Sequence, residues 1–440
     1  MNRDILRLAI PFVISNISVP ILGMVDLALL GHLDTPEPED YIGAIALGGM
    51  IFNIIYWGFS FLRMGTSGFT AQAYGRKDEK EVILILSRAL LVAISGSILL
   101  IAFQNPLDSL SFWIMDGSPE VERLAAEYFH IRIFAAPATI SLYAFTGWFL
   151  GMQNARYPMM IIILVNLLNL GFNVLFIYGF DMKHDGVALG TVLAQYSGMI
   201  LSVILFYRSY RHTLKKWEYR AMVQWKAIKQ FFLVNRDIFI RTLLLIFTFS
   251  FFTNVSAGMG DATLAVNTML LQYLFLFSYF IDGFANAAEA LVGKFVGAER
   301  PDMLKKSIKR LFVWGISISL PFSLMYYLAG NNLMYLLTSE ADVVLRAEPY
   351  LFWVALVPVV SFAAFIWDGV FIGATATAPM RNTLIVATLL IFLPSYYLLR
   401  EPLGNHGLWL AMMLFMLTRG IMLSLLAKKY VIRKPGLLSG

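Results

Sequence analysis

Residues 157–180 have the sequence YPMMIIILVNLLNLGFNVLFIYGF, which is apolar over nearly its whole length and contains no Asp, Glu, Lys or Arg. A helix of about 20 such residues crosses the hydrocarbon core of a bilayer. Eleven uncharged runs of at least 18 residues occur in the chain: 8–25, 42–62, 89–107, 133–155, 157–180, 186–207, 242–260, 262–281, 311–339, 349–367 and 382–399. A twelfth, 407–427, is interrupted only by Arg419. We therefore predict an all-α polytopic membrane protein with twelve transmembrane helices.

The composition of the 440 residues agrees with this class, since 59% are hydrophobic and only 14% are charged. A soluble chain is about 25% charged. Cysteine is absent, which excludes disulfides, thiolate metal sites and a cysteine nucleophile.

The net charge of +6 is distributed unevenly over the predicted loops. Loops that lie inside, if the N-terminus is inside, carry 21 Lys and Arg, whereas the outer loops carry two, Lys183 and Arg400. This positive-inside bias predicts that both termini lie in the cytoplasm. We expect a multi-pass protein of the plasma membrane, and more specifically of a bacterial inner membrane. The basic residues therefore indicate a bilayer partner and no nucleic acid.

The chain repeats itself at a shift of about 221–222 residues. Pro137 and Gly151 match Pro358 and Gly373 at this shift, and the tetrapeptide Asn-Arg-Asp-Ile occurs at both 2–5 and, at a longer shift, 235–238. Six helices separate the copies, so both halves have the same topology. We predict two six-helix lobes related by a pseudo-twofold axis along the membrane normal, a layout typical of transporters.

The predicted boundaries follow from the repeat. Residues 1–207 form the N-lobe, and residues 230–440 form the C-lobe. Residues 208–229 carry Trp217 and Trp225 among basic residues, which predicts a cytoplasmic amphipathic linker along the inner membrane surface.

Asp26, late in the first helix, is the candidate ion-coupling residue of the N-lobe. Between Arg7 and Arg63 no cation is available to pair with it. The fifth helix offers Asn169 and Asn173, four residues apart on one face, and the sixth offers Thr191. A buried carboxylate among such oxygens binds a proton or a small monovalent cation. The alternative is an aspartate at a helix end that faces outer water.

Three acids are candidates in the C-lobe. Asp282 and Glu289 lie seven residues apart on one helix and share a face, and Asp368 lies in the tenth predicted helix. Arg63 is the candidate cation of the same cavity network. A purely structural, neutralised network is equally compatible with the pattern, because buried ion pairs also fix geometry.

Prolines within predicted spans are candidate hinges, since proline removes a helical hydrogen bond and permits bending. They are Pro11 and Pro20 in the first helix and the matched pair Pro137 and Pro358. Catalysis is not predicted. The strings Gly65–Gly68 and Gly258–Asp261 imitate intramembrane proteases but lack the partner residues that such enzymes need, and small residues in membrane helices mostly mediate packing.

Six motifs together make the chain similar to a multidrug and toxic compound extrusion (MATE) transporter of the DinF-type branch. They are PILGMVD (20–26), FLRM (61–64), GFTAQAYG (68–75), DGF (282–284), AEAL (288–291) and DGVFIGA (368–374). The resemblance spans essentially the whole chain. It implies a monomeric antiporter that alternates between outward- and inward-facing states and exports amphipathic, mostly cationic compounds in exchange for protons or sodium ions.

The resemblance carries the N-lobe cation site over to Asp26, Asn169, Asn173 and Thr191. Many relatives have a second aspartate where this chain has Asn173, so the lower charge favours protons over sodium, and we predict no firmly bound metal and no cofactor. The alternative is a flippase for lipid-linked saccharides of the same superfamily. Such proteins tend to have cations in the cavity, whereas here the intramembrane charges are mostly acidic. An ion channel is disfavoured because no filter-like loop or ring of like charges occurs.

Overall fold

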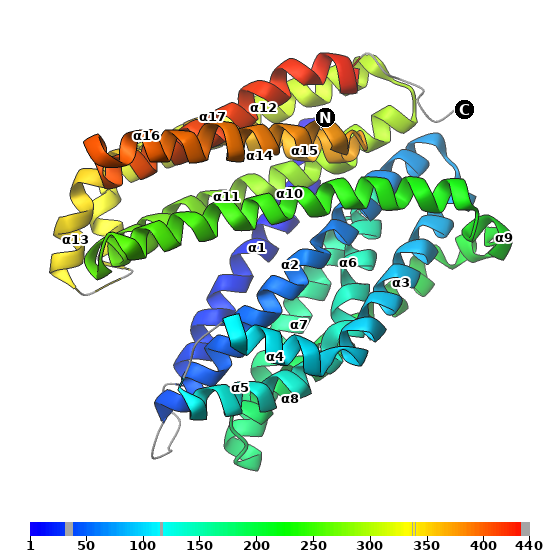
Figure 1. Ribbon diagram of the computed structural model, residues 1–440. Coiled ribbons are helices and arrows are strands. Elements are labelled where there is room, and N and C mark those ends of the chain that lie inside the picture. Colours follow the sequence, from blue (N-terminus) through cyan, green and yellow to red (C-terminus); the bar gives the residue numbers. More distant parts are fainter. Residues whose placement is uncertain (31–37, 115–117, 337, 339, 433–440) are drawn as a thin grey trace. The chain divides into compact units, whose positions relative to one another are not determined.

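The computed structural model describes residues 1–30, 38–114, 118–336, 338 and 340–432, and leaves the side chains of residues 19, 21–30, 38–39 and 114 undescribed (Figure 1). Every regular element among these residues is a helix. Eleven helical segments in the described part are long and apolar enough to cross a membrane, and α1 (Asn2–Leu30), 29 residues long, precedes them. The prediction of an all-helical polytopic membrane protein is confirmed.

The chain packs as two compact units. The N-unit consists of Ile14–Ala73 and Asp78–Phe231, and the C-unit consists of Met1–Val13, Tyr74–Lys77 and Phe232–Gly440. The first elements after α1 are α2 (Pro38–Arg76), α3 (Glu79–Ala102), α4 (Gln104–Ile114), α5 (Pro119–Arg132), η1 (Ile133–Ala135), α6 (Ala136–Gly151), α7 (Arg156–Val174), η2 (Leu175–Gly179), α8 (His184–Tyr210), η3 (Arg211–Lys216) and α9 (Tyr219–Met222). The remaining elements are α10 (Trp225–Gly258), α11 (Asp261–Gly297), α12 (Pro301–Met334), α13 (Ala341–Ala347), η4 (Glu348–Tyr350), α14 (Leu351–Gly373), α15 (Thr377–Ile385), η5 (Val386–Phe392), α16 (Leu393–Leu403), α17 (Asn405–Ala427) and η6 (Lys428–Ile432).

Both repeats end their second and fourth long helices in the same way. Lys77 and Glu299, at equivalent positions after α2 and α11, have left-handed φ values of 59° and 53°. Gln153 and Thr375, after α6 and α14, have values of 62° and 50°. In each case the left-handed residue and its successor donate to carbonyls of the last turn, as in a Schellman motif. The sequence repeat is therefore also a repeat of local backbone geometry.

Each repeat also brings its fourth helix against its second through two glycines. In the N-unit, a Cβ atom at Gly147 would lie 2.2 Å from the carbonyl oxygen of Arg63, so only glycine permits this crossing of α6 and α2. In the C-unit, a Cβ atom at Gly369 would lie 2.0 Å from the carbonyl oxygen of Ala285, where α14 crosses α11. Gly-x-x-x-Gly spacing in both α6 and α14 thus produces close backbone approach inside each unit.

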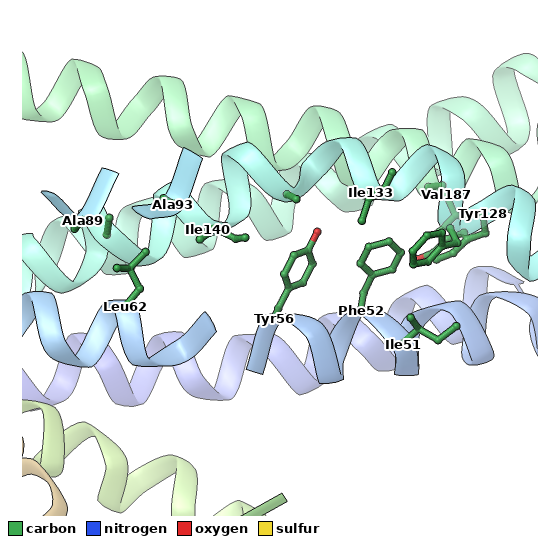
Figure 2. Close-up of a cluster of buried hydrophobic side chains, with 14 of the residues drawn as sticks. Ile51, Phe52, Tyr56, Leu62, Ala89, Ala93, Tyr128, Ile133, Ile140 and Val187 are labelled. Carbon is green, nitrogen blue, oxygen red and sulfur yellow. The ribbon is translucent and has the colours of Figure 1, made fainter. Parts of the chain in front are cut away.

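Large apolar side chains fill the core of the N-unit. Figure 2 shows Phe52, Tyr56 and Leu62 of α2 facing Ile133 of η1 and Ile140 of α6. Phe52 stacks on Phe129 with ring centroids 5.1 Å apart. Because lipid tails provide little hydrophobic drive between helices, such packing contacts hold membrane helices together.

The C-unit is arranged around α14, which packs against α11, α12 and α17. Buried amides join two helices, α11 and α17, at one end of this unit. Asn267 of α11 and Asn405 of α17 exchange two hydrogen bonds of 2.8 and 2.9 Å, and Trp409 donates to Asn267 at 2.9 Å. A mutually satisfied amide pair of this kind fixes the register of helices in an apolar medium.

The predicted hinge prolines occupy different structural positions. Pro11 is buried and Pro20 half-buried within the continuous helix α1. Pro137 lies at the start of α6, directly after the 3₁₀ turn η1, whereas Pro358 lies in the interior of α14. Pro137 and Pro358 match in sequence but therefore differ in their position along the helix. The role of all four prolines as hinges stays a prediction.

Candidate functional site

Three of the predicted ion-coupling residues meet where α7 packs against α8. The amide nitrogen Nδ2 of Asn169 donates to Oγ1 of Thr191 at 3.1 Å, and this hydroxyl donates to the Val187 carbonyl at 3.0 Å. Asn173, one turn further along α7, is only 1% exposed. A Cβ atom at Gly190 would lie 2.4 Å from Oδ1 of Asn173, so glycine admits this amide between the helices. The result is a buried group of amide and hydroxyl oxygens.

The helix that carries Asp26 is attached to the same face of α7. Nδ2 of Asn166 donates to Oγ of Ser18 on α1 at 3.1 Å, and Ser18 in turn donates to the Ser15 carbonyl at 2.7 Å. Asp26 follows Ser18 by eight residues, about 12 Å along a helix, and Asn173 follows Asn166 by seven. The Asp26 side chain lies outside the described residues, so its place in the ion site stays a prediction.

The C-unit contains a buried charged cluster centred on Asp368 of α14. One carboxylate oxygen, Oδ2, accepts from Arg241 of α10 and, at 2.7 Å, from Arg419 of α17. Arg419 is 2% exposed, and Asp368 is 6% exposed. The half-buried Asp282 of α11 also interacts electrostatically with Arg419. Two cations and the carboxylate of Asp368 thus join three helices, and the carboxylate of Asp282 interacts with the same cluster.

The other members of the predicted cavity network are distributed over both units. Arg63 is half-buried on α2 in the N-unit, where it interacts electrostatically with Tyr143. Glu289 is buried on α11 in the C-unit, and its backbone carbonyl lies against Gly373 of α14. The structure gives Asp368 two arginine partners that the predicted network did not include. Whether Arg63 joins the acids stays a prediction.

Sequence reasoning missed the role of the two arginines. Arg419 was visible as the single charge in the twelfth apolar run, and Arg241 directly precedes the uncharged run 242–260. A second cluster was missed as well: buried Asp237 accepts from Arg381 at 2.5 Å and from Thr377 at 3.3 Å. An isolated charge inside or beside an apolar span was the available signal, because such a charge needs a partner.

The two buried groups differ in chemistry. The α7–α8 group offers neutral oxygens and one predicted carboxylate, which suits a proton or a small cation. The Asp368 cluster already contains its own cations, and those cations neutralise the carboxylate. Among the described residues, no three His, Asp or Glu side chains come together as a metal site.

Comparison with known proteins agrees with this architecture. The MatE family model matches residues 11–175 and 238–398, one segment in each repeat. The chain is 35% identical to DNA damage-inducible protein F of Escherichia coli (strain K12), over 98% of this chain and 92% of the relative. It is 22% identical to probable multidrug resistance protein NorM of Thermotoga maritima, over 78% and 74% of the two chains. A solved structure described as the outward-facing conformation of a multidrug resistance MATE family transporter superposes with a TM-score of 0.87 at 20% identity, over 98% of this chain and 96% of that one.

Proposed function

The chain belongs to the MATE family of membrane transporters, and from this premise we propose that it is a secondary active antiporter. It exports amphipathic, mostly cationic drugs or toxic compounds in exchange for protons by alternating access. Family membership makes it a transporter and not an enzyme. In this proposal the transporter consists of twelve helices in two six-helix lobes related by a pseudo-twofold axis, which the whole-chain match to solved MATE structures supports.

The observation that carries the proposal is the buried polar group of α7 and α8 with α1 attached to it. Asn169 and Thr191 are hydrogen-bonded, and the Asn166–Ser18 bond holds α1 beside them. In the proposed topology α1 and α7 run in the same direction, so Asp26 and Asn173 stand at similar heights above the Ser18–Asn166 bond.

The proton is the favoured coupling ion because the polar group lacks a second carboxylate. Sodium binds best to several hard oxygens with net negative charge. Asn173 supplies an oxygen without a charge, and it is nearly fully buried. One carboxylate among neutral amides suits the gain and loss of a single proton.

The charge arrangement also favours the antiporter over the alternative function, a flippase for lipid-linked saccharides. A flippase needs cations that are available to a pyrophosphate group. Arg241 and Arg419 both bind the carboxylate of Asp368 and are buried in the C-unit, so this pair is already neutralised in part. We propose further that the protein acts as a monomer in a bacterial inner membrane, with both termini cytoplasmic.

The test is drug efflux from proteoliposomes with proton and sodium gradients imposed separately. Asp26→Asn imitates a permanently protonated carboxylate, so efflux against a drug gradient should be lost while the protein stays folded. Asn173→Asp should add a sodium response, since it restores a second carboxylate. Asp302→Asn, an exposed acid at the start of α12, is the matched control and should transport normally. Undiminished proton-driven efflux by Asp26→Asn would place the coupling elsewhere.

A further inference from the structure

The segment between α8 and α10 is an ordered element with distinct faces. Its first part, η3, is a 3₁₀ helix, in which residues three apart lie on the same face. Thr213 is buried and Lys216 pairs with Glu79 at 2.8 Å, so this row faces α3. Arg211 and Leu214 form a second row, and both are exposed.

Side chains of α3 form hydrogen bonds with this segment. Arg88, only 5% exposed, donates to the carbonyl oxygens of Ala221 and Met222 at 2.9 and 3.0 Å. These are the last two residues of α9, whose carbonyls lack helical partners. The indole nitrogen of Trp217 donates to Ser87 at 3.1 Å. The segment is therefore held on α3 in a fixed orientation, and both η3 and α9 pack against α3.

The face that α3 does not cover is cationic and aromatic. Tyr219 is 62% exposed and Trp225 is 74% exposed. Residues 208–229 contain seven Lys and Arg against one acid, Glu218, which already pairs with Lys80 at 2.5 Å. Of the seven, five have no ion pair among the residues that the structure describes: Arg208, Arg211, Lys215, Arg220 and Lys229. Arg211, Lys215 and Arg220 are the three of these that lie in η3 or α9.

We propose that Arg211, Leu214, Lys215, Tyr219, Arg220 and Trp225 form a binding surface for the anionic phospholipids of the surrounding membrane. We call these six residues the linker surface. The linker surface covers the last residues of one candidate membrane span, His184–Lys216, and the first residue of the next, Trp225–Gly258. The end of one span and the start of the next meet the same bilayer–water interface, where this surface is therefore placed. Tyrosine and tryptophan favour the headgroup level, and unpaired cations attract anionic lipids. This inference depends on the membrane class of the protein and is independent of the proposed antiport.

The rigid attachment distinguishes this surface from a flexible basic loop. Because Arg88 and Ser87 fix α9 and Trp217, the backbone that carries the cations and aromatic rings is held in place before the lipid arrives. A preordered surface loses less conformational entropy on binding. We therefore expect the linker surface to bind anionic lipid more tightly than the same number of basic residues scattered over a flexible loop would.

The experiment uses the full-length protein in detergent, titrated with phosphatidylglycerol or phosphatidylcholine while its thermal unfolding is followed. Phosphatidylglycerol should raise the unfolding temperature of the unmodified protein, and phosphatidylcholine should raise it far less. Arg211→Gln, Lys215→Gln and Arg220→Gln combined should weaken the apparent affinity for phosphatidylglycerol by roughly a hundredfold at low salt, about fivefold per cation. High salt should reduce the difference, since it screens exposed charges.

The matched control is Lys305→Gln, Lys306→Gln and Lys309→Gln combined, which removes three exposed cations from the first part of α12. This variant should keep the lipid response. An equal loss in both triple variants would show that bulk positive charge suffices, and this would overturn the proposal. An unchanged response in the linker variant would overturn it as well. Glycerophosphate at the same phosphate concentration should give no shift, and a shift equal to that of the lipid would assign the surface to free phosphate instead.

Discussion

At the scale of single residues, Asp368 is a buried acid of the C-unit that is paired with two arginines. Arg241 and Arg419 reach it from different helices, and all three side chains are buried. A charge at membrane depth is tolerated when it is paired, and it becomes expensive when its partner is removed. The cluster therefore fixes α10, α14 and α17 relative to one another.

This arrangement predicts an order of damage between two substitutions. Asp368→Asn removes the carboxylate from both arginines and should cost about 3–5 kcal/mol of stability. Arg419→Met leaves the Arg241–Asp368 pair intact, so it should cost less. Unfolding in detergent, followed by temperature or denaturant, measures the order. If Arg419→Met were the more damaging change, the carboxylate would not be the centre of the cluster.

At the scale of helices, the contact of the fourth helix with the second depends on the absence of a side chain. The Gly147 and Gly369 positions face backbone carbonyls at 2.2 and 2.0 Å from a hypothetical Cβ atom. Backbone cannot move aside as a flexible side chain can. Both repeats have kept this crossing even though the side chains around it differ.

Gly369→Ala should therefore destabilise the protein, by about 1–3 kcal/mol, because α14 must move away from α11. Gly171→Ala is the control, since a Cβ atom there meets nothing within 4 Å. Alanine has a higher helix propensity than glycine, so this control should be neutral or stabilising by up to about 1 kcal/mol. Comparing the unfolding temperatures of the two variants tests the prediction. Equal effects would mean that propensity, and not close approach, controls both positions.

At the scale of the whole molecule, duplication has preserved the framework while the polar groups have diverged. At the repeat shift, Asp368 corresponds to Thr146, and Arg419 corresponds to Gly198. Conversely, Thr191 of the α7–α8 polar group corresponds to Met412. The charged cluster therefore belongs to the second repeat and the neutral polar group to the first, which is consistent with ion coupling in one repeat only.

The membrane orientation is tested on the whole chain by cysteine labelling, which is clean because the native sequence has no cysteine. Lys215→Cys in η3 should react with a membrane-impermeant reagent only in inverted vesicles, since the basic loops are predicted to be cytoplasmic. Glu340→Cys, exposed before α13, should react in intact cells. Labelling of Lys215→Cys from outside intact cells would contradict the orientation.

The sequence alone determined the class of the protein and its repeat. Long uncharged runs can exist stably only as membrane helices, and this constraint is local, so 157–180 is sufficient to recognise it. The glycines of α6 and α14 and the amides of α7 can also be read directly from the sequence, because each set lies within a single helix. The sequence also grouped Asn169, Asn173 and Thr191, and in the structure Asn169 is hydrogen-bonded to Thr191 while Asn173 lies against Gly190. Their role in ion coupling stays a prediction.

Only the tertiary structure decided which charges pair. Asp368 is 127 residues from Arg241 and 51 from Arg419, and no spacing rule connects such positions. The predicted partner of the acids was Arg63, which directly follows the uncharged run 42–62. Partner choice depends on which helices pack together and on the rotation of each one about its axis. Those quantities are set by the glycine crossings and the core packing of each unit, and therefore by contacts between residues far apart in the chain.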